Sequence, residues 1–332
     1  MSRGAGFSLL ELTIALGMTL ALMAAISAVV RQSHGSAAAQ PETADMQQRL
    51  RVAVDTLTRD LMAAGAGPYV ANHRGPLNQS IPGVMPFRRG LVGTDAPGTF
   101  KSDTITLISV PTTAAQTELT ADFVPSSQTM QVARLAWCAN GTNLCSFSPG
   151  MSVLAFDAGG AFQTFSLAAV IDAASQLTMT SAPLTIYEAG TPVVEAQVRT
   201  YCLKVDAQSD TWQLVQYDGT ANADVPVLDH VVALTFEYFG DPAPGASTPI
   251  RSVELIDGPW RPNDPSADRW DSDLLRIRTV AVTIRVEAAA AALRGPAGAL
   301  FTNRGTATRA SVWAPDETIH FVVSPRNLNL RP

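Results

Sequence analysis

The residue with the clearest chemical question attached to it is Glu11, because it lies near the start of a long apolar stretch. From Phe7 to Val30 it is the only ionisable side chain. As a helix this stretch would be roughly 36 Å long at about 1.5 Å per residue, which is enough to cross a bilayer. A carboxylate in hydrocarbon costs on the order of 2.5–3.5 kcal/mol and needs a partner. The pattern therefore predicts a membrane-spanning helix in which the Glu11 carboxylate is paired with another group.

A partner for Glu11 would arise if the chain were cut after Gly6. The new ammonium group, on Phe7, would then lie within one helical turn of Glu11 or face the Glu11 of a neighbouring helix. The leader ahead of this junction carries one basic residue, Arg3, which weakly favours a cytoplasmic N-terminus.

Two other interpretations of the apolar stretch stay open. In the first it is a secretory signal removed before Gln40, with the small residues at 37–39 as the cleavage site. In the second it is an ordinary anchor, and Glu11 extends to the lipid headgroups. Either one would belong to a secreted or anchored β-rich binding protein or enzyme.

The segment GFSLLE, from Gly6 to Glu11, followed by the apolar run, resembles the processing signal of type IV prepilins and type II secretion pseudopilins. In that family a prepilin peptidase cuts after the glycine, here Gly6, and methylates the new terminal amine, here on Phe7. The equivalent of Glu11 pairs with the terminal amine of an adjacent subunit and sets the register of the filament. The resemblance implies a leader over 1–6 and a filament-core helix over 7–30.

Later segments resemble the PilW-type minor pilins, namely RDLMAAG from Arg59, VLDHVVALTFEYFGD, DLLRIRTVAVTIRV and the closing FVVSPRNLNL. The resemblance implies a subunit without catalytic activity or cofactor that primes assembly or forms the tip, in adhesion, twitching motility or DNA uptake. Its partners would be other minor and major pilins, the inner membrane and the pilus assembly platform. The head would lie in the periplasm before assembly and at the cell surface afterwards. The J-type minor pseudopilin of type II secretion is the alternative.

An amphipathic helix is expected next, within residues 31–66. Pro41 removes a helical hydrogen bond, so we expect a kink or break there. Beyond it, apolar residues recur at helical spacing and predict one buried stripe, formed by Met46, Leu50, Val54, Leu57 and Leu61. The helix should end at Gly65 or Gly67, before Pro68.

Residues 67–332 read as a β-rich head domain. After a loop-like region to residue 98, short runs rich in β-branched and aromatic residues alternate with turn residues, and helical periodicity is absent. Most links are too short for a crossover helix, which favours an antiparallel sheet. The expected fold class is therefore α+β, a long N-terminal helix followed by a mainly antiparallel head.

Composition narrows the function classes. The 332 residues are 46% hydrophobic and 16% charged, as in a folded protein, and the net charge of -6 comes without a basic cluster, so no direct nucleic-acid binding is expected. The four histidines are far apart and belong to no metal or hydrolase motif. We assign no active site.

Two further groups of side chains are candidates for a disulfide and for a calcium site. Cys138 and Cys145 bracket a tight-turn sequence, so a disulfide there would close a small hairpin; two free thiols, or a pairing that involves Cys202, are the alternatives. The acidic loop from residue 240 to 273 offers weak calcium candidates, Asp264, Asp268 and Asp271, against the simpler interpretation of solvated carboxylates. We expect Trp260 and Trp270 to anchor this loop on the sheet.

Overall fold

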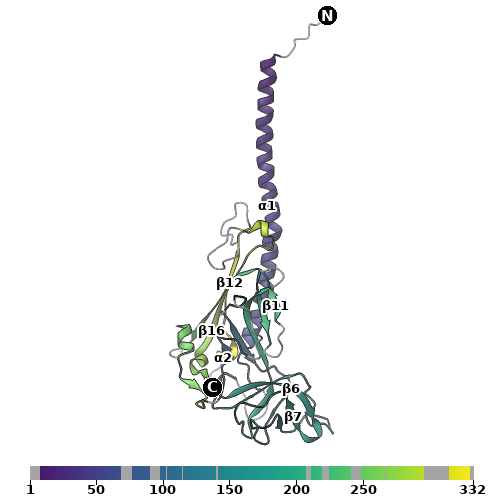
Figure 1. The fold of residues 1–332 in the computed structure, drawn as a ribbon, viewed down its shortest axis with the longest axis vertical. Coiled ribbons are helices and arrows are strands. Elements are labelled where there is room, and N and C mark those ends of the chain that lie inside the picture. Colours follow the sequence, from purple (N-terminus) through teal and green to yellow (C-terminus); the bar gives the residue numbers. More distant parts are fainter. Residues whose placement is uncertain are drawn as a thin grey trace. The chain divides into compact units, whose positions relative to one another are not determined.

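The computed structural model describes residues 8–68, 77–89, 98–101, 103–113, 115–139, 141–206, 211–218, 224–240, 248–265, 267–294 and 314–329. It has the expected α+β class: a long N-terminal helix and a body of mostly antiparallel strands (Figure 1). The chain divides into two compact units. The first comprises Met1–Gln48 and Val286–Glu317, and the second Arg49–Arg285 and Thr318–Pro332.

Helix α1 runs without interruption from Leu9 to Ala63 (Figure 1). Of the kink or break expected at Pro41, the break is therefore wrong. A proline costs a helix one backbone hydrogen bond, and here the helical turns on both sides of it continue the same element. The first residues past the helix include Gly65, whose positive φ of 72° is the left-handed conformation that commonly ends helices.

In the first unit, α1 is accompanied by the short segment that follows strand β16 (Ile277–Val286). The Glu42 carboxylate accepts hydrogen bonds from the backbone N–H groups of Ala289 and Ala290. A 3₁₀ turn, η5, spans Ala291–Leu293, and the Arg294 guanidinium lies 3.5 Å from the buried Glu287 carboxylate. This part of the helix thus has polar contacts with its own unit.

In the described residues, the second unit contains three larger sheets and a two-stranded ribbon. The five-stranded sheet has the order β1-β2-β9-β10-β11, with bounds Val84–Met85, Ile105–Ser109, Gln197–Asp206, Thr211–Tyr217 and Val225–Leu228. The four-stranded sheet has the order β13-β12-β16-β17, with β13 at Thr248–Ile250, β12 at Val231–Gly240 and β17 at Glu317–Val323. The ribbon pairs β14 (Trp260–Arg261) with β15 (Trp270–Asp271).

The six-stranded sheet has the order β3-β8-β5-β6-β7-β4, with bounds Gln116–Glu118, Pro192–Glu195, Ser152–Phe156, Phe162–Ile171, Gln176–Met179 and Thr129–Gln131. Every neighbouring pair in it is antiparallel. One face covers an apolar cluster in which Phe123 and Phe165 meet edge to face at 5.6 Å between ring centroids. This sheet therefore has a core of its own.

The strand-like runs of the sequence correspond well to these strands, with two differences. The stretch VVEAQVRTYCLKV, from Val193 to Val205, has the pattern of one strand in the sequence, but it forms two strands in two different sheets, β8 and β9, separated at Ala196. The run that ends at Trp137 is a strand only over Thr129–Gln131. Turns connect the rest, with 3₁₀ turns η1 to η4 at Leu77–Gln79, Asp172–Ala174, Ser252–Leu255 and Ser272–Arg276, and a final short helix α2 at Arg326–Asn329.

The end of α1 is bound tightly to its unit. Leu57 and Leu61 are fully buried, as the stripe predicts, and Ala53 is buried where Val54 was expected to be. Just past the helix, the Gly65 N–H donates to the carbonyl of Ile108 in β2. Gly83 approaches so closely that an added Cβ would lie 2.5 Å from the Gly65 nitrogen, which explains a glycine there.

Candidate functional site

The N-terminal part of α1 is long and apolar enough to cross a membrane. The span is Leu9–Val30, 22 residues with a mean hydropathy of 2.2, and none of its side chains is buried in the structure. Its large apolar residues, such as Leu9 at 81% exposure, project outward all round the helix. A helix that is apolar on every side requires an apolar environment, which a bilayer or a bundle of similar helices provides.

Glu11 closes the start of this helix. Its backbone N–H donates to the Ser8 hydroxyl at 3.2 Å, and its carboxylate accepts the Ser8 N–H at 2.9 Å. This reciprocal pair is a capping box, which satisfies two of the N–H groups that a helix start leaves without partners. Among the described residues, Glu11 has no partner beyond this first turn. The predicted processing residues, Gly6 and Phe7, lie outside the described residues.

Cys138 and Cys145 are joined by a disulfide, and the pairing that involves Cys202 is not formed, since Cys202 is a buried thiol in β9. The predicted small hairpin is wrong, because no strand lies in the described residues from 135 to 150. Instead the turns are held by Asp172, whose carboxylate accepts the N–H groups of Asn143 and Leu144 at 2.9 and 2.7 Å. A carboxylate distant in sequence thus replaces the strand pairing.

The calcium candidates do not form a cation site in the described part of the chain. Asp268 forms an ion pair with Arg89. Asp271 is buried and accepts the N–H groups of Gly258 at 2.6 Å and Asp273 at 2.8 Å, so its carboxylate caps a turn. Asp264 contributes its backbone carbonyl to a turn with Ala267. Each aspartate serves the loop rather than a shared ligand.

The two tryptophans of the acidic loop differ. Trp270 is 1% exposed and donates its indole N–H to the Gly160 carbonyl at 2.8 Å, so it anchors the loop on the β5–β6 turn as expected. Trp260 is 39% exposed, and the expectation that it is an anchor is wrong. Of the histidines in the described residues, His320 contacts the Thr283 hydroxyl and His230 lies next to Asp229, so they share no site.

A second buried acid of the second unit, besides Asp271, is Asp60, which the sequence alone did not single out. Its carboxylate accepts hydrogen bonds from the Arg199 guanidinium and the Tyr201 hydroxyl of β9. Burial, and then the hydrogen bond to Asp60, raise the pKa of the Tyr201 phenol above its usual range. The hydrogen bond to Asp60 also raises the pKa of Arg199. The sequence did offer a signal, because Asp60 follows Leu57 by three residues and so lies on the buried stripe.

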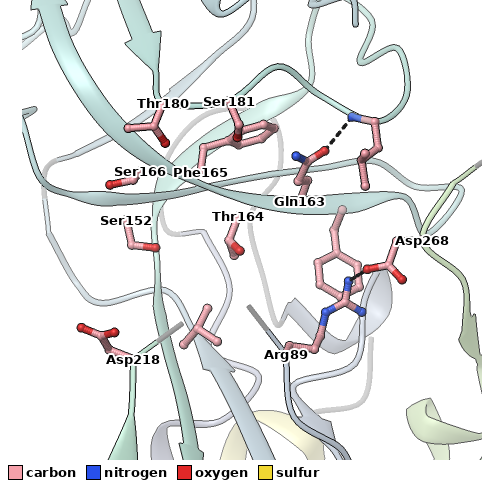
Figure 2. Close-up of a pocket in the computed structure, with 13 residues that line it drawn as sticks. Arg89, Ser152, Gln163, Thr164, Phe165, Ser166, Thr180, Ser181, Asp218 and Asp268 are labelled. Carbon is pink, nitrogen blue, oxygen red and sulfur yellow. Dashed lines mark hydrogen bonds and ion pairs between the residues drawn. The ribbon is translucent and has the colours of Figure 1, made fainter. Parts of the chain in front are cut away.

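A cavity of about 520 Å³ lies beside strands β5 and β6 of the six-stranded sheet (Figure 2). Its hydroxyl-bearing residues are Ser152, Thr164, Ser166, Thr180 and Ser181. We call this cavity the hydroxyl pocket. The register of the β5–β6 hairpin explains part of the grouping, because Ser152 pairs with Ser166, and Ser166 and Thr164 lie two positions apart on one face of β6.

Figure 2 shows Arg89 and Asp268 at the opposite end of the hydroxyl pocket, which Phe162 also lines. The guanidinium carbon of Arg89 lies 4.3 Å from the centre of the Phe162 ring, a cation–π arrangement, while the group pairs with the Asp268 carboxylate. Burial lowers the pKa of Arg89, and the charge of Asp268 opposes that shift. The positive charge is thus already neutralised by a neighbour.

Comparison of the chain with protein-family models, with curated proteins and with solved structures found no match.

Proposed function

We propose that the chain is a minor type IV pilin, cut after Gly6 by a prepilin peptidase, methylated at Phe7 and built into a pilus through its apolar helix. The observation that carries the proposal is the helix Leu9–Val30, which is apolar on all sides and has one carboxylate, Glu11, in its first turn. Its role would be to prime assembly or form the tip. The protein would be held in the inner membrane beforehand.

The geometry of the first turn supports this proposal. In the uncut chain the Glu11 carboxylate accepts the Ser8 N–H, so its partner is a neutral donor of its own helix. Cleavage after Gly6 would place an ammonium group one residue before Ser8. The bond from the neutral Ser8 N–H to the carboxylate lacks a positive charge on the donor, whereas an ammonium group would add a direct attraction between opposite charges. Processing would therefore give Glu11 a stronger partner, on its own helix or on a neighbour. A cut at this junction converts a helix cap into a charge pair.

The type II secretion pseudopilin has the same N-terminal chemistry, so the first test addresses what both share. The protein is purified from the membranes of the cells that make it, and its N-terminus is determined by mass spectrometry. We expect a mature chain that begins at N-methylated Phe7. A chain that begins at Gln40 would identify a secretory signal, and one that begins at Met1 or Ser2 a simple anchor; either would overturn the proposal.

The second test separates processing from assembly. Glu11→Gln keeps the size of the side chain and removes its charge, so cleavage should continue while incorporation into filaments falls at least tenfold. The loss of one member of a buried charge pair costs about 3 kcal/mol or more, and each 1.4 kcal/mol or so is a factor of ten. Thr13→Val is the matched control, because the Thr13 hydroxyl bonds only to the Leu10 carbonyl of the same helix. Quantitative immunoblots of sheared filaments measure incorporation. Normal amounts of the Glu11 variant would contradict the register role.

A further inference from the structure

We propose that the hydroxyl pocket binds a neutral saccharide. This inference is independent of the proposed assembly function, because the pocket lies in the second unit and the inference concerns binding rather than filament formation. It rests on the size of the cavity, on the hydrogen-bonding capacity of its walls and on the charges that are already paired.

The size fits a small ligand. Ligand pockets in proteins typically have volumes of about 300–1,000 Å³, and this cavity has about 520 Å³. It also combines apolar and polar walls, because Leu184, 61% exposed, lies on the same cavity as the hydroxyl groups. Sugars likewise present C–H surface beside their hydroxyl groups, so both kinds of wall have something to contact.

The hydroxyl groups are available. None of the side chains of Ser152, Thr164, Ser166, Thr180 and Ser181 forms a hydrogen bond within the described part of the chain, and none of their oxygens is enclosed in the core. Figure 2 shows those of Ser152, Ser166 and Thr180 at one end of the cavity, away from Arg89. A hydroxyl donates one hydrogen bond and accepts two, as does each hydroxyl of a sugar. The hydroxyl groups of the pocket wall can therefore each donate and accept hydrogen bonds with the hydroxyl groups of a polyhydroxylated ligand.

Gln163 illustrates the contrast, because its amide is already used. The Gln163 side-chain oxygen accepts the Leu184 N–H at 2.8 Å, and its nitrogen donates to the Ala182 carbonyl at 3.4 Å (Figure 2). The amide therefore holds the loop after β7 in place. It positions the wall, whereas the five hydroxyl groups are left for a ligand.

The charges favour a neutral ligand. The Arg89 guanidinium is paired with Asp268 and covered by Phe162, so an anionic ligand would have to displace Asp268. Asp218 also lines the pocket and, as a carboxylate, accepts hydrogen bonds but repels anions. A sugar hydroxyl can donate to such a carboxylate without a charge of its own.

The strand arrangement argues against an extended peptide. A peptide that adds to a sheet needs an edge strand with free backbone groups. Here β5 pairs with β6 and β8, and β7 pairs with β6 and β4, so the strands under the pocket are interior strands. Side chains on the face of the sheet are the groups that meet the ligand.

The test is saturation-transfer difference NMR with the full chain in detergent micelles. The probes are lactose, maltotriose and N,N′-diacetylchitobiose as neutral saccharides, 3′-sialyllactose as an anionic one, and a neutral hexapeptide. We expect transfer to at least one neutral saccharide and none to the peptide. Absence of transfer to all three neutral saccharides at millimolar concentration would overturn the inference, as would binding of the peptide or the anionic sugar alone.

Variants locate the binding. The double variant Thr164→Val with Ser166→Ala removes two hydroxyl groups at nearly constant volume and should weaken binding about fivefold or more. Thr178→Val is the control, because Thr178 is on β7 but does not line the pocket. Circular dichroism melting shows that the variants fold, and Ser152→Trp, which fills the cavity, gives a second measurement. Undiminished transfer in the double variant and in Ser152→Trp would place the saccharide elsewhere and overturn the inference.

Discussion

Helix α1 carries an acid among apolar residues near each of its ends, Glu11 and Asp60. The hydrogen-bond partners of these two carboxylates come from different parts of the chain. At the start, and among the described residues, Glu11 is bonded only to Ser8 of its own first turn, within a span that is exposed on every side. Near the end, Asp60 is 7% exposed and is bonded to Arg199 and Tyr201 from a strand far away in sequence. The chain thus supplies the partners of Asp60 from its own strand β9, whereas the apolar surface around Glu11 is not covered by the described part of the chain.

Removing the carboxylate of Asp60 should have the largest effect on the fold. Asp60→Ala leaves the buried Tyr201 hydroxyl and the half-buried Arg199 guanidinium without their acceptor. Loss of one member of a buried charge pair costs about 3 kcal/mol or more in free energy of unfolding. Urea denaturation of the full chain in detergent micelles, followed by tryptophan fluorescence, measures it.

Asp55→Ala is the control for this variant, since Asp55 is exposed on the same helix. It should change the free energy of unfolding by less than about 0.5 kcal/mol. Equal effects of the two substitutions would mean that helix propensity, and not the buried cluster, explains the loss. In that case the contrast between the two ends of the helix would not hold.

The Tyr201 hydroxyl gives the same cluster a pH dependence. Its pKa is raised in the folded chain, mainly by burial, so its stabilising contribution is complete below the ordinary value of 10.0 and is lost as the pH rises above it. Tyr201→Phe should cost about 1.5–3 kcal/mol near pH 8, the value of a hydrogen bond to a charged group. Above pH 10 the difference between wild type and variant should shrink, by up to about 1.4 kcal/mol per pH unit.

Unfolding free energies measured from pH 8 to pH 11 test this sign. Tyr238→Phe is a useful comparison, because burial also raises the pKa of Tyr238, but its hydroxyl has no hydrogen-bond partner among the described residues. That variant should lower the alkaline slope without a comparable loss near pH 8. A constant gap between wild type and Tyr201→Phe across the range would contradict the raised pKa of Tyr201, and a loss near pH 8 no larger than that of Tyr238→Phe would contradict its hydrogen bond to Asp60.

The sequence predicted what depends on local pattern. The buried stripe with Leu57 and Leu61, most strands and the exposed apolar span all follow from periodicity and length. It did not predict contacts between distant residues, such as the use of Asp172 to hold the loop around Cys145 or the pairing of Arg89 with Asp268. The break expected at Pro41 failed for a related reason, because a single-residue preference was weighed without the helical turns on both sides.

The hydroxyl pocket likewise could not be predicted from the sequence. Ser152 and Thr164 are ordinary strand residues in the sequence, and no motif sets them apart. They meet because β5 and β6 pair in one particular register, in which a shift by one residue would turn every hydroxyl to the other face. Register is fixed by the packing of the whole sheet, so the pocket was visible only in three dimensions.

The smallest expected effect on the stability of the fold is that of Glu11→Gln. It tests most directly whether Glu11 and Asp60 differ in their role in folding. Glu11→Gln retains a group that can accept the Ser8 N–H, and both Gln and Glu serve at this position of a capping box. Its surroundings contain no distant side chain of the described residues to be left unpaired. The free energy of unfolding should therefore change by less than about 0.5 kcal/mol, in the same urea titration that shows a loss of about 3 kcal/mol for Asp60→Ala. A large loss would mean that Glu11 supports the fold of its own chain, and a defect in assembly could then no longer be attributed to a missing partner between subunits.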